Sequence, residues 1–553
     1  MNKTVLLCNI VSMTIPVVMG IVLFRTETES KISYATRNIK NLSIDSEEST
    51  SLVSSSKEMI NIQVKFDYDQ FTYSKPNKID DIDAFRNEML RKGKEYHYQR
   101  NLELLDKLDI TDFKNVYVSK YMPYFSFECE NTELNDLYEN HLKTYENKSY
   151  IAKVDIQKSK KLFKNQTTNT KYDYGINTYH NTYNIKGRNI KVGILESGIV
   201  DITHSTLANH IVRYDHWAVW ETPTQHALTT ANIIGGTNGL APECLMYSAQ
   251  LTGTPVDEFD WFLDNGVHIV NMSYGEANPT GYYNNDTAYI DAIVNTYGIT
   301  CIAAAGNEGE TCAYVNNPAL GYNILGIGQC DNDNATRMLA SSYLEETGPE
   351  KPNIMCRGLV YIPSLRETYT GTSCSSAIVS GVSALLMEKY PDFKLFPERL
   401  FSVLCATNDS LNANEGATYN GLRDISGVGG CLDPLQAYQN IINEEHLFFT
   451  TNEYAGEAIY LDLERGDRLK VSAWWRAYAD GNIANTAHTD YDLILYDEYF
   501  YKAAESRFGR NNNEYFEIVI TANGRYCIDF SGGGTKAQTE ENYCVAWYIE
   551  PAE

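Results

Sequence analysis

Short apolar runs alternate with helix-like stretches between residues 175 and 442. Four of the runs have the length and composition of strands: IKVGIL (190–195), HIVNMSY (268–274), TCIAAAG (300–306) and NILGIG (323–328). Runs that are apolar throughout are typical of strands with both faces covered. The pattern therefore predicts an α/β domain over 175–442, in which helices cover both faces of a parallel sheet.

The chain before this domain divides into three parts. Residues 1–25 contain the one long apolar stretch, at 4–24, and we expect a signal peptide or a membrane anchor there. Residues 26–60 are rich in Ser, Thr, Glu and Lys and are predicted to be a linker. Residues 61–165 show an α+β pattern. Strands are expected at 62–71, 116–129 and 149–157, and helices at 82–108 and 133–145.

Residues 445–553 show a third pattern, in which strand-like segments follow one another without helices. The segments are AIYLDL, RLKVSAWW, YDLILYD, YFEIVIT, RYCIDFSG and YCVAWYI, with Gly, Asn and Asp between them. This spacing predicts a small antiparallel β-sandwich.

The composition narrows the possible functions. The formal net charge is -26, which argues against a nucleic-acid partner because phosphate groups repel such a field. Hydrophobic residues make up 43% of the chain, as in a globular protein. With the apolar segment at 4–24, these features indicate a secreted or cell-surface protein, with membrane anchorage through 4–24 as the alternative to a cleaved signal.

The twelve cysteines show no CxxC pair and no Cys/His cluster at ligand spacing, so no metal site is predicted. Cys301 and Cys405 lie in apolar runs and are interpreted as buried free thiols. Cys527 and Cys544 flank strand-like segments and would be able to pair in an oxidising compartment.

Four polar residues lie at the ends of the apolar elements of the α/β domain. Ser373 follows a Gly-Thr turn at the start of an apolar helix, where a free backbone N–H and the helix dipole favour a developing oxyanion. Taken alone, it would more often be an N-cap serine. His226 heads another helix, Asn307 lies in a glycine turn after a buried strand, and Glu196 ends the strand IKVGIL.

Together these segments resemble the subtilisin family of serine peptidases. GTSCSSAIVSG resembles the family's serine motif and AAAGNEG its oxyanion-hole motif, while NMSYG and GLAPECLMYSAQL resemble the segments around its substrate-binding edge. The order of acid, base, asparagine and serine is also the family's order. The resemblance covers residues 175–442.

The resemblance implies a serine endopeptidase that acts on protein or peptide substrates through an acyl-enzyme, with no required cofactor. Ser373 would be the nucleophile, His226 the base, Glu196 the orienting acid and Asn307 the oxyanion donor. Two segments would bind the substrate and form the walls of its binding site: Ser273, Tyr274 and Gly275 on one side, and Ala304, Ala305 and Gly306 on the other. They would favour an apolar side chain at P1, the substrate residue before the cleaved bond.

The resemblance also assigns roles to the flanking regions. Residues 61–165 lie where family members carry a propeptide that assists folding and inhibits the enzyme, so self-processing within about 160–175 is expected. The C-terminal region is similar to the pre-peptidase or convertase-type β domains of secreted proteases. The loop after His226 is shorter than in calcium-stabilised members, so any calcium would bind at a site that the sequence does not locate.

Departures from the family pattern keep other functions open. The family has Asp where this chain has Glu196, and Pro where it has Ala377. A catalytically degenerate pseudopeptidase that acts as a binding or surface protein is therefore the main alternative. A structural protein that acts through its C-terminal sandwich, and a cysteine hydrolase that uses Cys374, are further alternatives. Asp201 competes with Glu196 for the role of the acid.

Overall fold

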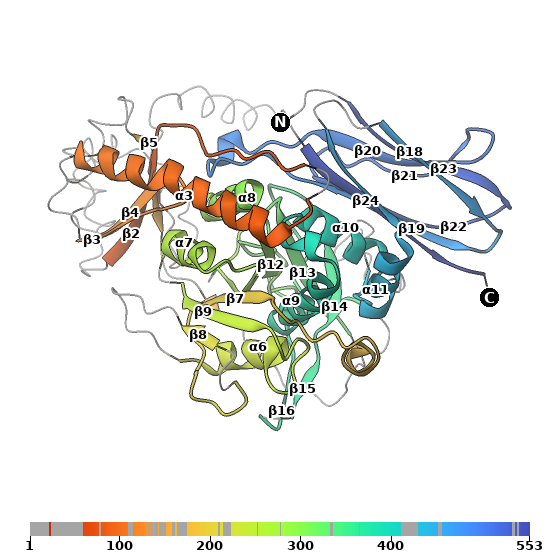
Figure 1. The fold of residues 1–553 in the computed structure, drawn as a ribbon, viewed down its shortest axis with the longest axis horizontal. Helices are drawn as coiled ribbons and strands as arrows, with labels where there is room; N and C mark the ends of the chain where they lie inside the picture. Colours follow the sequence, from red (N-terminus) through yellow and green to blue (C-terminus); the bar gives the residue numbers. More distant parts are fainter. Residues whose placement is uncertain are drawn as a thin grey trace, which may run out of the picture. The chain divides into compact units, whose positions relative to one another are not determined.

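The computed structural model describes most of the chain from residue 59 onwards (Figure 1). The described ranges are 21–23, 59–76, 79–108, 114–130, 151–157, 161–162, 174–207, 211–213, 223–251, 253–276, 278–331, 336–363, 365–410, 430–451, 456–533, 537–538 and 541–552, with single residues at 133, 137 and 142. Most of the apolar segment 4–24, nearly all of the expected linker and nearly all of the expected helix at 133–145 lie outside them. Among the described residues, no helix is both long and apolar enough to cross a membrane.

The chain forms two compact units. The first contains residues up to 71, 91–159 and 252–260, and the second contains 72–90, 160–251 and 261–553. The first unit holds a five-stranded sheet in the order β1-β5-β2-β4-β3. Its strands are β1 (Ile21–Leu23), β2 (Met59–Phe66), β3 (Lys114–Val118), β4 (Tyr124–Glu130) and β5 (Ile151–Gln157). The α+β pattern expected here is present, and Ile21–Leu23 of the apolar segment is a strand.

The second unit is built on a seven-stranded parallel sheet in the order β14-β13-β12-β10-β7-β9-β8. Its strands are β7 (Lys191–Glu196), β8 (Ile211–Arg213), β9 (Leu245–Gln250), β10 (Ile269–Met272), β12 (Thr300–Ala304), β13 (Ile324–Cys330) and β14 (Ile354–Arg357). All four predicted strands of this domain are present. Strand order reverses beside β7, and ligands of such sheets bind at the carboxyl ends of the strands near that point.

Both faces of this sheet are covered by helices. Val192 and Ile194 on β7 belong to the cluster formed with α6 (Gln225–Gly235) and α9 (Thr372–Lys389). Gly193, between them, points the other way, because a Cβ placed on it would lie 3.0 Å from the ring of Phe262 in α7 (Val256–Asp264). Since neighbouring residues of a strand face opposite sides, helices lie on both. The predicted α/β fold is confirmed.

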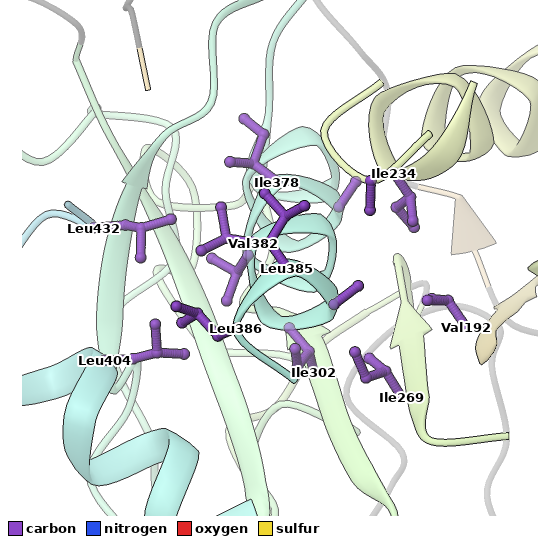
Figure 2. Packing of buried hydrophobic residues seen from close by; sticks show 14 of the residues in the cluster. Val192, Ile234, Ile269, Ile302, Ile378, Val382, Leu385, Leu386, Leu404 and Leu432 are labelled. Atoms are coloured by element: carbon purple, nitrogen blue, oxygen red, sulfur yellow. The ribbon is translucent and has the colours of Figure 1, made fainter. Parts of the chain in front are cut away.

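Helix α9 forms the centre of this core (Figure 2). Ile378, Val382 and Leu385 are fully buried on it, and the cluster continues to Ile269 and Ile302 on the sheet. Residues 372–387 of α9 are all buried, so the sheet and the surrounding helices fix its position. The start of α9, and therefore Ser373, is held rigidly.

The C-terminal region forms two four-stranded antiparallel sheets with a shared core. One has the order β17-β24-β19-β22 and the other β18-β23-β20-β21. Their strands are β17 (His446–Thr451), β18 (Gly456–Leu463), β19 (Arg468–Trp475), β20 (Asp490–Tyr496), β21 (Lys502–Ser506), β22 (Asn513–Val519), β23 (Gly524–Gly533) and β24 (Glu541–Glu550). All six predicted strands are present; β17 and β21 were not predicted. Buried side chains of both sheets, such as Val471 and Phe530, pack together.

Helix α10 (Pro397–Ala406) joins these sheets to the α/β domain. The Arg476 guanidinium, just after β19, forms an ion pair of 2.7 Å with Glu398 on α10, and both side chains are at most 3% exposed. The same guanidinium donates to the backbone oxygens of Leu395, at 2.6 Å, and Asn295, at 3.4 Å. Ser402 on α10 also donates to the Ser472 carbonyl. Buried polar contacts of this kind tie the two regions into one unit.

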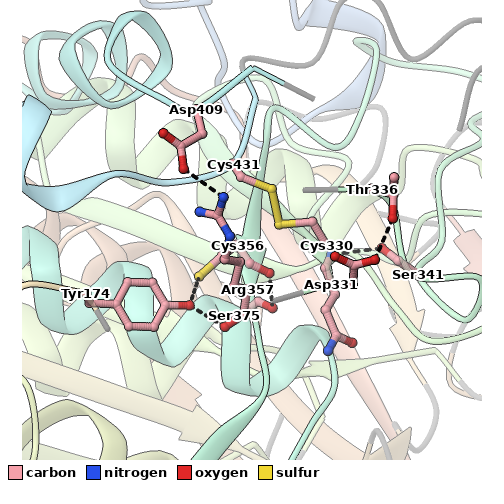
Figure 3. Close-up of a disulfide and its surroundings, with 11 residues drawn as sticks. Tyr174, Cys330, Asp331, Thr336, Ser341, Cys356, Arg357, Ser375, Asp409 and Cys431 are labelled. Atoms are coloured by element: carbon pink, nitrogen blue, oxygen red, sulfur yellow. Dashed lines mark hydrogen bonds and ion pairs between the residues drawn. A yellow bond between two sulfur atoms is a disulfide. The ribbon is translucent and has the colours of Figure 1, made fainter. Parts of the chain in front are cut away.

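A disulfide joins Cys330, at the end of β13, to Cys431 (Figure 3). The thiols of Cys301 and Cys405 are free and buried, as predicted. The suggested pairing of Cys527 with Cys544 is wrong, because both are free thiols. Tyr460 on β18 lies opposite Cys527 on β23, and Cys544 belongs to β24 in the other sheet, so the two cysteines have different strand neighbours.

Replacing Arg476 with Met should destabilise the protein strongly, because Glu398 would keep a buried charge without its partner. Removing one member of a buried pair lowers the free energy of unfolding by about 3–5 kcal/mol. Urea unfolding followed by tryptophan fluorescence measures the change. The control is Arg507→Met, since that side chain is 56% exposed and its pair with Asp492 is solvated. Equal unfolding midpoints for the two variants would contradict the prediction.

Candidate active site

The carboxyl ends of the central strands bring the predicted polar residues to one edge of the sheet. Glu196 is the last residue of β7, Ser273 follows β10, and Asn307 lies three residues beyond β12. His226 is the second residue of α6, which begins at Gln225 after the N-cap Thr224. Parallel strands end on the same side, so residues far apart in the sequence meet there.

Glu196 and His226 form a direct pair. The Nδ1 atom of His226 lies 2.5 Å from Oε2 of Glu196, with the carboxylate fully buried and the imidazole 8% exposed. Burial alone lowers the pKa of His226, but the charge of Glu196 and its hydrogen bond outweigh this and raise the pKa above 6.5. The carboxylate therefore favours the tautomer that carries its proton on Nδ1, and leaves Nε2 to accept one. Nε2 has no hydrogen-bond partner in the described part of the chain.

Ser373 lies in the first turn of α9, directly after a backbone turn that requires glycine. Gly371 has φ 135°, in the region that residues with a Cβ avoid, and it redirects the chain into the helix. The Ser373 hydroxyl lies 3.5 Å from the carbonyl oxygen of Ser273 and is not hydrogen-bonded to His226. Catalytic hydrogen bonds of unliganded enzymes are often long and shorten with substrate, so this geometry is compatible with a nucleophile.

The Asn307 side chain forms hydrogen bonds through its amide oxygen but not through its amide nitrogen. Its Oδ1 accepts hydrogen bonds from the backbone N–H and from the hydroxyl of Thr372, both at 3.0 Å. These bonds fix the amide beside the start of α9. The Nδ2 donor is shielded from solvent and has no partner among the described residues. Because buried donors are nearly always paired, an unpaired one beside Ser373 indicates a place for a ligand oxygen.

The two predicted substrate walls flank this point. Strand β11 (Tyr274–Gly275) follows Ser273, and Ala304, Ala305 and Gly306 continue from β12, with Gly306 at φ 116°. Strand β6 (Lys161–Leu162) pairs antiparallel with β11, with Leu162 opposite Tyr274. Leu162 therefore lies opposite the residue next to Ser273. The edge expected to bind an extended peptide therefore already carries a segment of this chain.

Asn316, which the sequence did not reveal, contacts residues at both walls. Its Oδ1 accepts a hydrogen bond from the Glu276 N–H next to the first wall, and its Nδ2 donates to Glu308 at 3.1 Å. A Cβ added to Gly306, on the second wall, would lie 2.5 Å from this Nδ2. Asn316 lies nine residues after Asn307 and has no motif of its own, so only the fold identifies it.

Asp201 and Cys374, the alternative candidates for the acid and the nucleophile, both have other surroundings. The Asp201 carboxylate accepts hydrogen bonds from the N–H and hydroxyl of Thr203 and closes a local turn, which lowers its pKa. Cys374 points into the apolar core, where burial raises its thiol pKa. Within the described ranges, no group of three His, Cys, Asp or Glu side chains is placed to hold a metal ion. The possible calcium site stays a prediction.

Comparison with known proteins identifies this domain. Residues 187–429 match the model of the Subtilase family. These residues form a subtilase domain. Subtilisin DY of Bacillus licheniformis is 28% identical over 256 residues, which cover 42% of this chain and 89% of that protein. Subtilisin E of Bacillus subtilis is 27% identical over 37% of this chain and 57% of its own length.

Among solved structures, the prenylagaramide maturation protease PagA matches with a TM-score of 0.39 and 23% identity, over 48% of this chain and 97% of its own.

Replacing Glu196 with Gln in the subtilase domain should lower turnover by about 10,000-fold, because an amide favours the wrong tautomer of His226. In the parent, activity should fall as pH decreases through the raised pKa of His226, since the base accepts a proton only when neutral. Without the carboxylate this inflection should move to lower pH. Peptide hydrolysis measured from pH 5 to 9 tests both effects.

Asp201→Asn is the matched control and should leave the turnover and the pH profile nearly unchanged. A nearly normal Glu196→Gln enzyme together with an inactive Asp201→Asn enzyme would assign the acid to Asp201 instead.

Proposed function

We propose that this protein is a serine endopeptidase that is made as a self-processing precursor. The observation that carries the proposal is the buried pair of Glu196 and His226, with an unpaired His226 Nε2, at the sheet edge where Ser373 and Asn307 also lie. A pseudopeptidase would not need an imidazole whose Nδ1 is paired with a buried carboxylate and whose Nε2 is left to accept a proton. The burial of both partners makes the arrangement costly to retain for packing alone.

The proposed reaction is acyl transfer. His226 Nε2 takes the hydroxyl proton of Ser373 as the serine oxygen bonds to the peptide carbonyl carbon. The resulting oxyanion receives hydrogen bonds from Asn307 Nδ2 and from the Ser373 backbone N–H at the start of α9. The imidazolium, stabilised by Glu196, then protonates the leaving nitrogen as the carbon–nitrogen bond breaks. Water attacks the acyl-enzyme by the same route, which releases the acid and regenerates Ser373.

Strand β6 supports processing within the same chain. It pairs with the edge strand β11, where Leu162 lies opposite Tyr274, and the carbonyl of the adjacent Ser273 lies 3.5 Å from the Ser373 hydroxyl. We infer that the cleaved bond lies between Leu162 and residue 175, and that the preceding residues act as an intramolecular inhibitor until then. The disulfide between Cys330 and Cys431 supports an oxidising compartment, and so export.

Self-processing is tested by comparing the parent chain with Ser373→Ala. The parent should convert to two fragments, with the new N-terminus between residues 163 and 176, while Ser373→Ala should remain intact. Electrophoresis and N-terminal sequencing measure this, and labelling by a fluorophosphonate probe reports the reactive serine. Identical cleavage in both chains would overturn self-processing. Absence of labelling in the parent would favour the pseudopeptidase alternative.

We propose that Asn316 forms the floor of the P1 pocket, and we therefore expect small apolar side chains there. Asn316 is fully buried and is fixed by Glu276 and Glu308, so its amide limits the depth between the walls. Asn316→Gly should open the pocket and raise the ratio of kcat/KM for P1 Phe over P1 Ala by roughly 10-fold or more, since each methylene-sized difference in an apolar pocket changes kcat/KM 10–200-fold. Paired peptides that differ only at P1 measure the ratio.

Asn317→Gly, one residue further along the same loop, is the control and should leave the preference unchanged. An unchanged ratio in Asn316→Gly would place the P1 pocket elsewhere.

A further inference from the structure

The hairpin that connects β20 to β21 carries three consecutive aromatic residues, here called the aromatic tip. Tyr499 is 71% exposed, Phe500 77% and Tyr501 73%. Because the three residues are adjacent in the chain, their exposed rings form one apolar patch. Soluble proteins expose large apolar patches mainly where they contact a partner, a ligand or a membrane. The aromatic tip is therefore a candidate contact surface.

Asp497 holds the aromatic tip in one conformation. Its carboxylate accepts hydrogen bonds from the backbone N–H groups of Tyr499, at 2.9 Å, and Tyr501, at 2.8 Å. Its own N–H donates to the Tyr501 carbonyl, and its carbonyl accepts from the Phe500 N–H. Since the loop is ordered before it meets anything, binding through it loses little conformational entropy.

The backbone of Phe500 is strained. Its φ is 61°, in the left-handed region, where a Cβ is disfavoured and glycine or asparagine is usual. A phenylalanine at this position lowers stability through its backbone, and its ring gains little from folding because it stays exposed. Strained residues are concentrated at functional sites. Folding therefore does not account for a phenylalanine here.

Two tyrosines extend the aromatic surface across the sheet behind the tip. Tyr460 on β18 and Tyr496 on β20 both lie opposite Cys527 on β23, so the three side chains form one row. Tyr460 is 54% exposed, which places the row on the outer face of the sheet. The Arg525 guanidinium lies 4.8 Å from the Tyr460 ring. Tyr496 ends β20, so the row lies next to the hairpin.

We propose that the aromatic tip inserts into the interface of an uncharged, zwitterionic lipid bilayer and holds the protein at a membrane surface. Phe500, at the centre of the tip, enters the boundary of the acyl chains. The flanking tyrosines lie at the level of the headgroups, where aromatic residues with a polar end are enriched. Arg525 keeps its charge in water on an extended side chain. The proposal does not depend on the peptidase reaction or on the apolar segment 4–24.

The area of the tip favours a bilayer over a folded protein. From the usual area of aromatic side chains and their exposed fractions, the three rings offer roughly 300–550 Å². A specific protein interface buries roughly 800 Å² on each partner. Attachment to a lipid interface has no such threshold, because its strength scales with the apolar area that enters the lipid.

The charges beside the tip favour an uncharged surface. Asp497 and Glu498 directly precede the three aromatic residues. Lys502, which directly follows them, forms a salt bridge with Glu505. The whole chain carries a formal net charge of -26. Anionic headgroups repel such a field, whereas zwitterionic headgroups do not.

The test places a fluorescent reporter on the tip itself, because total binding to vesicles would also report residues 4–24. The full-length Ser373→Ala chain carries Phe500→Trp and is mixed with phosphatidylcholine vesicles that have brominated acyl chains. Bromine in the acyl region quenches an indole that enters the bilayer, so fluorescence should fall further than in the Ser373→Ala chain without the added tryptophan. Quenching no greater than in that chain overturns the proposal and would leave a protein as the occupant of the tip.

Phe508→Trp in the same Ser373→Ala chain is the matched control. Phe508 lies beyond the opposite end of β21 and is 38% exposed, so a tryptophan there should show no added quenching. Equal quenching at residues 500 and 508 would mean that the sheets adsorb to vesicles without using the tip, and would overturn the assignment.

Phe500→Gly tests the role of the strained residue. The melting temperature should stay equal or rise, because glycine accepts the left-handed backbone without strain. In a chain with Tyr499→Trp as the reporter, the same substitution should abolish most of the quenching, since the ring that contributes most apolar area is lost. A lower melting temperature would show that Phe500 serves folding, and unchanged quenching would show that it does not insert. Either result overturns the proposal.

The lipid composition tests the choice of surface. Replacing part of the phosphatidylcholine with phosphatidylserine should reduce quenching of the tryptophan at residue 500 at low ionic strength, because the acidic residues beside the tip are repelled. Stronger quenching on the anionic vesicles would overturn the preference for an uncharged surface. Peptidase activity enters none of these measurements, so an inactive enzyme would overturn the proposed function and leave this proposal unaffected.

Discussion

The packing of α9 through the core fixes the position of almost everything else in the subtilase domain. The helix contains several serines, which must find partners because no water reaches them. Ser375 donates to the Cys356 carbonyl and Ser380 to the Asn271 side chain, so these hydroxyls connect α9 to β14 and β10. Ser376 donates back to the Ser373 carbonyl. These bonds set the rotation of the helix as well as its depth, and so the direction in which its first turn faces.

The Glu196 carboxylate lies in the same buried region. The carboxylate is fully buried, and its second oxygen has no partner among the described residues, so its charge is balanced mainly by His226. A carboxylate that is so little solvated attracts a proton on the imidazole strongly, because the surrounding dielectric is low. The additional methylene of glutamate brings the carboxylate within 2.5 Å of the ring from the last position of β7.

The sequence predicted the parts of the structure that depend on local pattern. Uniformly apolar runs identified the strands of the parallel sheet, and the position of Ser373 before an apolar helix identified α9. The resemblance to a known family brought Glu196 and His226 together in the prediction, and they do form a pair. Contacts between residues that belong to no motif were not predicted. Asn316 lies in an irregular loop and is held by hydrogen bonds with Ala305, Glu276 and Glu308. The pairing of Cys330 with Cys431, 101 residues apart, likewise follows from strand order and not from spacing.

The Asn295 carbonyl near the end of α8 (Asn285–Tyr297) accepts hydrogen bonds from two distant parts of the chain. These are Lys75, before α3 (Ile82–Asp106), and Arg476, after β19. Two donors that share one acceptor are energetically linked, because movement of either changes the strength of the other. Such linkage is reciprocal. If a ligand of the C-terminal sheets displaced Arg476, it would therefore alter how tightly Lys75 is held at the same carbonyl.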